Sequence, residues 1–341
     1  MDREKLDTVC ENFINSTMDF YDIPGIAVGV CVDKTICTVA GGYKNYVTKE
    51  PVETDTVFHC TSVSKLFTAV GVMKLAEEGK LCLADRLSDI LPFLTIADER
   101  WQNITIETML THTSGLTDIF DYHWEEHKIE ENALREYAVS EEVVDRKLLW
   151  DPKEGHFRYS SMAYNLLGLV IAEVSGMPFE DYMENEIFKP LGLKDTTFKT
   201  FERTNGLAKP HSKGRDRTIR PEEVYPYTRQ HAPSSTLTSN VADLLKWATA
   251  IMNSTALCRE STEDMWQPRV SVPDTGEKMG LGWFIREQDG YTLMGHEGSD
   301  DGFRTSFWMC PELKIAIVLL CNLTDAPLKK LNKQLFDNIQ K

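Results

Sequence analysis

The sequence predicts an α+β fold in which strands from both ends of the chain build one antiparallel sheet, flanked by helices, with a helical subdomain inserted. Three observations support this prediction. Strand-like runs rich in β-branched residues occupy 25–45 and return after residue 278, helical patterns dominate the segment between them, and each end carries a helical pattern. We therefore expect a discontinuous sheet subdomain (1–97 and 266–341), a mainly helical subdomain (98–265) and an active site in the cleft between them.

The N-terminal part of the chain is predicted to form a helix, a hairpin and a second helix. Residues 1–20 carry apolar side chains at helical spacing. The runs GIAVGVCVD (25–33) and TICTVAGGYKN (35–45) are typical of strands joined by a tight turn. The apolar run at 63–78 predicts a long helix that stops at Gly79, because glycine commonly follows the last helical residue.

The middle of the chain is predicted to be helical. Its helical segments are ITIETMLTHTSGL, the acidic stretch EEHKIEENALREYAVSEEVVDRKLL, and MAYNLLGLVIAEVSG, whereas 206–235 is irregular and contains prolines. After residue 278 the pattern changes to strands, in GLGWFIREQ, YTLMGHEG, FRTSFWMC and KIAIVLLCN. The segment APLKKLNKQLFDNIQ then predicts a closing helix.

The composition is that of a globular protein and argues against some partners. The chain has 341 residues, 42% of them hydrophobic, and a formal net charge of −16. This length allows one large domain or two closely packed ones. The negative charge disfavours nucleic acid and anionic membranes as partners, since both attract an excess of lysine and arginine.

The eight cysteines favour a reducing compartment. None forms a CxxC pair, and several lie in apolar strand-like runs, as do Cys31 and Cys321, which predicts buried free thiols. The acidic first residues do not resemble a secretory signal, and no apolar run reaches the roughly 18 residues that span a bilayer. We therefore expect a cytoplasmic protein, with a processed secreted form left open.

HCTSVSKLFT (59–68) contains the strongest nucleophile candidate, a serine followed three residues later by a lysine. Residues three apart lie on one face of a helix, so Ser62 and Lys65 would be neighbours at the start of the helix predicted at 63–78. The helix N-terminus would stabilise negative charge, and Lys65 would serve as a base if burial or a nearby cation lowered its pKa. Alternatively, Thr61 or Ser62 is only an N-cap.

Two further segments carry groups suited to acyl transfer. Tyr159 precedes an apolar helix in RYSSMAYNLLG (158–168), and a tyrosinate can act as a general base if neighbouring cations lower its pKa. In MGHEGSDDGFRTSFW (294–308), a strand ends in His-x-Gly, where glycine lets the backbone approach a substrate and an edge strand can offer an oxyanion donor. Both also have an ordinary structural explanation, as a half-buried tyrosine and a hairpin turn.

In this order, SVSK, YSS and HEG resemble the three signature elements of serine β-lactamases of the class C type, which penicillin-binding DD-peptidases and related esterases and D-aminopeptidases share. Supporting similarities are IPGIAVGV, MLTHTSGLTD (109–118), the long segment 157–196 and GLGW. The resemblance covers roughly residues 20–325. It implies a β-lactamase/transpeptidase-like fold, which agrees with the split sheet predicted from the strand pattern.

The resemblance implies a serine hydrolase that acts through a covalent acyl-enzyme on a small ester, amide or peptide, without a metal or organic cofactor. Ser62 would be the acylated nucleophile, Lys65 would assist proton transfer, and Tyr159 would be the general base that also protonates the leaving group. The implied substrate-binding and oxyanion positions are Ser161, His296 and Gly298, and the backbone N–H groups of Ser62 and Ser299.

Two departures from the family pattern concern the substrate. Ser161 stands where the second motif commonly has asparagine, and a hydroxyl makes fewer contacts to a substrate amide. The HEG motif (296–298) replaces Lys-Thr-Gly, so a fixed cation near a substrate carboxylate is lost, because His296 is only partly protonated near neutrality. Arg286 or Arg304 would supply a carboxylate anchor, unless both are merely solvated strand charges.

Two alternatives remain open, and a third lacks its motif. HWEEH (123–127) matches an inverted zinc-peptidase pattern, in which His123 and His127 would share a helix face and the third ligand is undetermined. An α/β-hydrolase would need Gly-x-Ser-x-Gly, which the sequence lacks. The non-enzyme alternative is a catalytically weak or inactive penicillin-binding-like protein that keeps the fold for binding.

Overall fold

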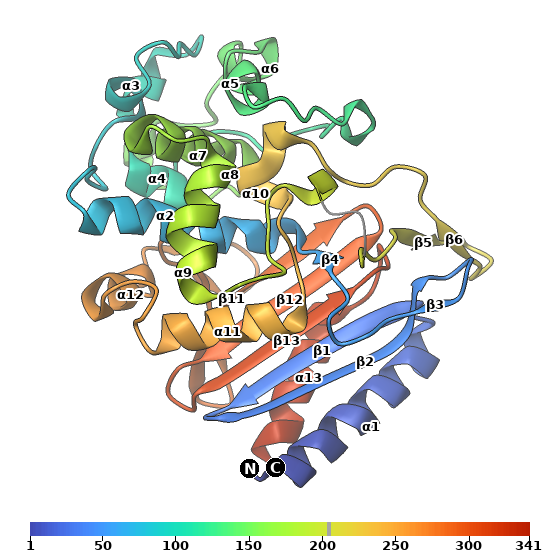
Figure 1. Cartoon of the computed structure of the whole chain (residues 1–341). Coiled ribbons are helices and arrows are strands. Elements are labelled where there is room, and N and C mark those ends of the chain that lie inside the picture. Colours follow the sequence, from blue (N-terminus) through green and yellow to red (C-terminus); the bar gives the residue numbers. More distant parts are fainter. Residues whose placement is uncertain (203–205) are drawn as a thin grey trace.

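Strands from both ends of the chain lie side by side in one sheet, as predicted (Figure 1). The computed structural model describes residues 1–202 and 206–341. In these residues nine antiparallel strands follow the order β3-β2-β1-β13-β12-β11-β10-β9-β8, so the first hairpin lies against the last strand. The sheet consists of β1 (Gly25–Val32), β2 (Thr35–Asn45), β3 (Glu50–Pro51), β8 (Val270–Ser271), β9 (Lys278–Met279), β10 (Phe284–Gln288), β11 (Tyr291–Asp300), β12 (Phe303–Cys310) and β13 (Ile315–Cys321). Two short pairs stand apart from it, β4 (Phe58–His59) with β7 (Thr238–Ser239) and β5 (His211–Lys213) with β6 (Ile219–Pro221).

Helices cover both faces of this sheet. α1 (Arg3–Tyr21) and α13 (Leu328–Gln340) pack on one face, and α11 (Val241–Met252) packs on the other (Figure 1). β1 is therefore buried along almost its whole length. Val28 joins the core under α1 and α13, whereas Ala27 joins the core on the opposite face. This two-sided burial explains why the strand has a continuous apolar run rather than alternation.

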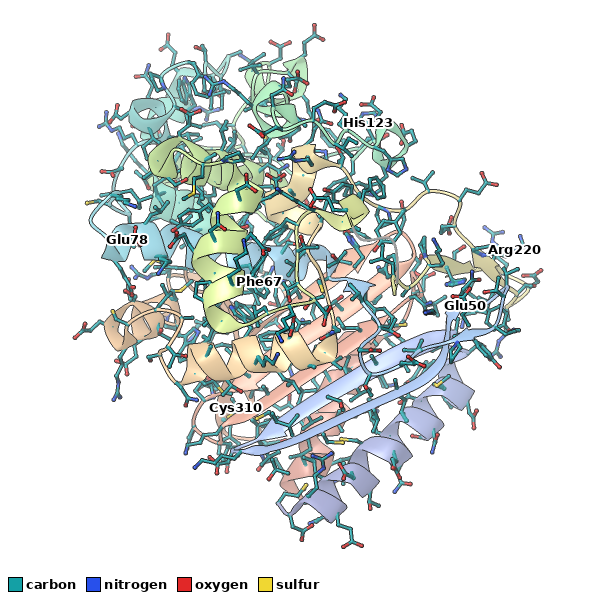
Figure 2. All side chains as sticks on the ribbon, viewed as in Figure 1. Glu50, Phe67, Glu78, His123, Arg220 and Cys310 are labelled. Atoms are coloured by element: carbon teal, nitrogen blue, oxygen red, sulfur yellow. The ribbon has the colours of Figure 1, made fainter. Side chains whose placement is uncertain are left out.

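A layer of helices above the α11 face holds the segment that follows Ser62. α2 (Ser64–Glu77) packs on α7 (Ser161–Ser175) and α10 (Ala232–Ser235). Its Phe67, labelled in Figure 2, stacks on Trp247 of α11 with 3.8 Å between ring centres. The remaining helices and turns are α3 (Leu87–Ile90), α4 (Ile106–Leu110), α5 (Ala133–Ala138), α6 (Glu141–Val144), α8 (Phe179–Tyr182), α9 (Lys189–Leu191), α12 (Arg259–Met265), the 3-10 turns η1 (Thr61–Val63), η2 (Glu99–Asn103), η3 (Trp124–Glu126), η4 (Pro152–Glu154), η6 (Thr200–Glu202) and η7 (Arg229–His231), and the π-helical turn η5 (Met183–Phe188).

Two of the predicted helices are wrong in extent. α4 ends at Leu110, because His112 and Gly115 adopt positive φ values of 58° and 76° that an α-helix does not accommodate. The acidic stretch forms η3, α5 and α6 rather than one helix. Only short groups of its apolar residues reach the core, such as Leu134 and Tyr137 of α5, so a continuous helix would gain little packing.

The subdomain boundaries stay a prediction, and two helices pack across them. α11 lies within 98–265 but packs on β1 and β13 of the sheet. α2 lies before residue 98 but packs on α7 and α10 of the helical layer. The segment that carries Ser62 therefore runs from the sheet layer into the helical layer.

Within the described part of the chain, no single helix is long and apolar enough to cross a membrane. The bent pair formed by Ser161–Ser175 and Phe179–Leu191 meets the requirements of length and composition only when both helices are counted together. The first helix of this pair, α7, is buried along most of its length against α2 and α10.

The contact between α7 and α10 provides a test of this packing. Gly168 of α7 has no room for a side chain, since a Cβ atom there would lie 2.0 Å from Cγ of Pro233. We expect Gly168→Ala to lower the free energy of unfolding by roughly 1–3 kcal/mol, measured by urea denaturation. Gly71→Ala in α2 is the control, because its nearest neighbour is the flexible Met183 side chain at 3.0 Å. Equal losses of stability in the two variants would contradict this packing.

Candidate active site

Ser62 lies at the junction between the sheet and α2. It occupies the middle of η1, the turn that leads directly into α2, so it stands at the N-terminal end of a 14-residue helix. Thr61 before it adopts a φ of 50°, which is strained for a β-branched residue. The turn presents Ser62 to a cavity of about 870 Å³. Other residues that line this cavity are Asp118, Tyr122, Tyr159, Ser161, His296 and Glu297.

Lys65 lies one helical turn beyond the serine and is fully buried. Its Nζ atom donates to Ser62 Oγ at 3.2 Å and to the carbonyl oxygen of Ser234 at 2.9 Å. Burial lowers the pKa of Lys65 to about 8, although the carboxylates of Asp118 and Asp300 act in the opposite direction. From the sequence, Lys65 is expected to serve as a base only if burial or a nearby cation lowers its pKa. Burial does lower it in the structure.

Tyr159, in the loop before α7, lies next to Lys65 and Ser62. Lys65 Nζ lies 4.8 Å from the centre of its ring. Burial raises the pKa of Tyr159 well above its ordinary value, and a hydrogen bond to Ser62 only partly opposes this effect. Neighbouring cations therefore do not lower the pKa of this phenol as the tyrosinate hypothesis requires, and the resting site holds a neutral tyrosine. Of the two groups, Lys65 is the better proton acceptor.

β11 borders the cavity with an open edge. β10 pairs with β11 only as far as Gly295, whereas β12 pairs with it as far as Asp300. Residues 296–300 therefore keep one side free of strand pairing, and Gly298 and Ser299 line the cavity there. A free strand edge can pair with an extended substrate. The role of the Ser299 N–H group as an oxyanion donor stays a prediction, and its place on the open segment supports it.

His296 enters the cavity as a neutral ring. Its Nδ1 atom donates to the carbonyl oxygen of Glu297 at 2.5 Å. Burial lowers the pKa of His296 to about 3, and the charge of Lys65 acts in the same direction. The expectation that His296 is partly protonated near neutrality is therefore wrong in this environment. His296 supplies no positive charge to a substrate carboxylate.

Glu297 points to the other face of β11, toward the core under α13. Its carboxylate accepts hydrogen bonds from Trp308 Nε1 at 2.5 Å and from Ser306 Oγ at 3.1 Å. Burial raises the pKa of Glu297 to about 7, and these donors only partly oppose the shift. The middle residue of the HEG motif thus has different surroundings from the two residues beside it.

The two arginines considered as carboxylate anchors lie in different places. Arg286 is 3% exposed, and its guanidinium carbon lies 3.9 Å from the centre of the Trp308 ring. It donates to Asn332 Oδ1 of α13 at 3.2 Å, so it is neither a solvated strand charge nor a lining residue of the cavity. Arg304 does line the cavity, with its nearest acid, Asp325, at 3.9 Å. Of the two, only Arg304 is placed to meet a substrate.

Ser161 begins α7 and is held by two neighbours that the sequence does not predict. Its hydroxyl accepts a hydrogen bond from the Tyr122 hydroxyl at 2.9 Å. Its backbone N–H group donates to Asp118 Oδ1 at 2.7 Å. Asp118 closes the MLTHTSGLTD segment that carries part of the family resemblance, which is the one signal that points to it. Tyr122 has no comparable sequence signal.

The zinc alternative lacks the helix face that it requires. HWEEH forms only the three-residue turn η3, and His123 and His127 both adopt the left-handed conformation at its ends. His127 Nδ1 lies 3.1 Å from the carbonyl oxygen of Tyr227, whereas His123 lies half exposed in the helical layer (Figure 2). Across residues 1–202 and 206–341, no group of three or more His, Cys, Asp or Glu side chains is placed to hold a metal ion.

A comparison with protein families identifies the family of this chain. The family model described as Beta-lactamase matches residues 11–337. The chain belongs to the beta-lactamase family. This membership confirms the resemblance drawn from SVSK, YSS and HEG, and it supports a hydrolase in the broad sense.

Relatives of this beta-lactamase family member include penicillin-binding proteins. Penicillin-binding protein 4* of Bacillus subtilis (strain 168) is 26% identical over 303 residues, which cover 82% of this chain and 64% of that protein. The octameric penicillin-binding protein homologue from Pyrococcus abyssi has a TM-score of 0.85 at 25% identity, covering 100% of this chain and 78% of that chain. The D-amino acid amidase from Ochrobactrum anthropi SV3 has a TM-score of 0.82 at 20% identity, covering 99% of this chain and 98% of that chain. This last likeness concerns the fold alone.

The shifted pKa of Lys65 predicts a pH dependence for this family member. Because the lysine accepts a proton only when neutral, we expect kcat/KM for p-nitrophenyl acetate to rise with pH and to level off above a midpoint near 8. Initial rates across the neutral and alkaline range, corrected for spontaneous hydrolysis, measure this midpoint. Lys65→Arg, which stays charged throughout, should lose at least about 10²-fold in rate. A midpoint near the ordinary histidine pKa would contradict the lysine base.

Proposed function

We propose that this chain is a serine hydrolase that cleaves esters and amides through an acyl-enzyme on Ser62. The observation that supports it most is the 3.2 Å contact between Lys65 Nζ and Ser62 Oγ, in a place where burial lowers the lysine pKa to about 8. A buried lysine with this pKa is partly neutral near physiological pH. It can therefore take the serine proton while the bond to the substrate forms.

In the proposed acylation, Ser62 Oγ attacks the carbonyl carbon and its proton passes to Lys65 Nζ. The carbonyl oxygen becomes an oxyanion, which the backbone N–H groups of Ser62 and Ser299 and the N-terminus of α2 stabilise. As the intermediate collapses, the neutral Tyr159 hydroxyl protonates the leaving group and recovers a proton from the Lys65 ammonium. Water then attacks the acyl carbon while one of its protons passes to Lys65 Nζ. As the bond from the acyl carbon to Ser62 Oγ breaks, Lys65 returns this proton to Oγ, which releases the acid and restores the serine.

The charges around Ser62 favour an acyl group that carries an amine. Asp118 lines the cavity next to Ser161 and acts electrostatically on Lys65. His296 is neutral, and Arg304, which also lines the cavity, lies 3.9 Å from the carboxylate of Asp325. Asp118, beside Ser161, can therefore offer its carboxylate to a substrate ammonium. Lysines that line the cavity belong to α13, on the other face of the sheet. Since one structural neighbour is named a D-amino acid amidase, we propose D-amino-acid amides or short peptides as the substrate class.

Intact mass measurement tests the acyl-enzyme. Brief incubation with benzylpenicillin or a p-nitrophenyl ester should add the acyl mass to the wild-type chain but not to Ser62→Ala, which should lose all turnover. An adduct formed with benzylpenicillin would indicate penicillin binding, whereas an adduct formed only with the p-nitrophenyl ester would indicate esterase activity. Tyr159→Phe should keep the fold and lower turnover by about 10²- to 10⁴-fold, since it loses the proton donor for the leaving group.

Two results would contradict this proposal. An active Ser62→Ala variant would exclude Ser62 as the nucleophile. A wild-type chain that forms no adduct and turns over neither the ester nor D-phenylalanine amide would instead favour an inactive penicillin-binding-like protein. Circular dichroism of each variant serves as the control for folding.

The proposed ammonium contact predicts a second pH effect. The α-amino group of an amino-acid amide loses its charge near pH 8, where Lys65 becomes a base. We therefore expect kcat/KM for D-phenylalanine amide to pass through a maximum near pH 8, whereas that for a neutral ester only levels off. Asp118→Asn keeps the oxygen that accepts from the Ser161 N–H group but loses the charge. It should lower kcat/KM for the amide by about 10-fold and leave the plateau for the ester unchanged. Equal losses on both substrates would contradict the contact.

A further inference from the structure

The two predicted oxyanion donors come from separate segments of the chain. Ser62 lies in η1, at the start of α2, and Ser299 lies near the end of β11. An oxyanion hole requires both N–H groups to converge on one atom, so the relative position of these segments must be held closely. The groups that connect these two segments therefore bear directly on the geometry of the oxyanion hole.

One buried side-chain pair spans the two segments. His59 Nε2 lies 2.8 Å from Asp300 Oδ2, and the two side chains are 0% and 7% exposed. His59 precedes Ser62 by three residues, and Asp300 directly follows Ser299. Because a carboxylate only accepts hydrogen bonds when ionised, Nε2 is the donor of this contact. The pair thus connects the chain just before one donor to the chain just after the other.

The backbone of β11 is also pressed against the turn that carries Ser62. A Cβ atom on Gly298 would lie 1.6 Å from Thr61 Oγ1, so only glycine fits there. Thr61 itself holds a strained φ of 50°. The neighbouring β12 adds a weak contact of 3.5 Å from Thr305 Oγ1 to the carbonyl oxygen of His59. Because the turn is strained, a further interaction is required to keep Gly298 of β11 in contact with Thr61.

The surroundings of His59 leave its ring little freedom. Its centre lies 5.4 Å from that of Phe303, 6.1 Å from that of Tyr225 and 6.5 Å from that of Trp124. His59 is also part of β4, where it pairs with Thr238 of β7. Aromatic packing and strand pairing thus fix the ring at one end of the contact, and the β11 backbone carries the other end.

We propose that His59 and Asp300 are positioning residues that hold β11 against the nucleophile turn and thereby set the spacing of the two oxyanion donors. This inference rests on the proposed function, since the donors matter only if Ser62 is acylated. Neither side chain needs to touch the substrate in this role. Their loss should slow the formation of the oxyanion, and so lower kcat, more than it weakens substrate binding.

Asp300 has a second, electrostatic effect that a purely structural contact would not have. Its carboxylate raises the pKa of Lys65, as Asp118 does, against the larger effect of burial. The other titratable groups that Lys65 affects are His112, His231 and His296, and its charge lowers the pKa of each. Loss of the Asp300 charge should therefore move the midpoint of the pH profile to a lower pH.

Four variants of the full chain test the positioning role with p-nitrophenyl acetate. His59→Phe keeps a ring but loses the N–H donor, and we expect kcat to fall by about 10²-fold with little change in KM. His59→Gln restores an N–H donor near the Nε2 position and should recover most of this loss. Asp300→Asn should lower the pH midpoint of kcat/KM. Asp301→Asn is the matched control, because it removes an exposed acid one residue further along and should behave as wild type.

The outcomes separate this inference from the proposed function. If the wild-type chain is acylated at Ser62 and active, but His59→Phe is equally active, the positioning role alone is overturned. Equal losses in His59→Phe and His59→Gln would overturn it as well, because the donor would then be irrelevant. If the wild-type chain is neither acylated nor active, the proposed function fails and the inference falls with it. Should His59→Phe not fold, Asp300→Ala breaks the same contact and must reproduce the fall in kcat.

Discussion

Burial of the Lys65 ammonium is the constraint on which the rest of the site depends. Its hydrogen-bond partners are the Ser62 hydroxyl and the Ser234 carbonyl group rather than a carboxylate. A charged amine is costly in such a place, so its pKa falls and the serine gains a base from its own helix. The rings of Tyr159 and Tyr164, with centres 4.8 and 5.8 Å from Nζ, offset part of that cost.

The Lys65 charge lowers the pKa of three buried histidines, and all three are neutral. Burial lowers the pKa values of His112, His231 and His296, and the Lys65 charge adds to the shift in each case. The inner part of the site therefore keeps Lys65 as its titrating cation near neutral pH. His296 occupies the position where the family commonly has a lysine. Because His296 is neutral, it does not place a second positive charge beside Lys65.

The alternation of side chains along β11 assigns different roles to adjacent residues of one motif. His296 and Gly298 face the nucleophile turn, whereas Glu297 faces Trp308 and the core under α13. The glutamate is therefore a neighbour of α13 rather than of Ser62. Its raised pKa reflects that interior, so this departure from the family pattern acts on a part of the cavity away from the nucleophile.

The sequence by itself determined the two hairpin strands, α2, α7, the C-terminal strands and the serine–lysine pair, because apolar periodicity and three-residue helical spacing are local properties of the chain. Only the tertiary structure decided which distant groups complete the site. Asp118 reaches it from a loop, and His59 meets Asp300 across 241 residues, so neither contact has a local pattern. The protonation states of Lys65 and Tyr159 also depend on tertiary structure, since desolvation is set by what the whole chain packs around a group.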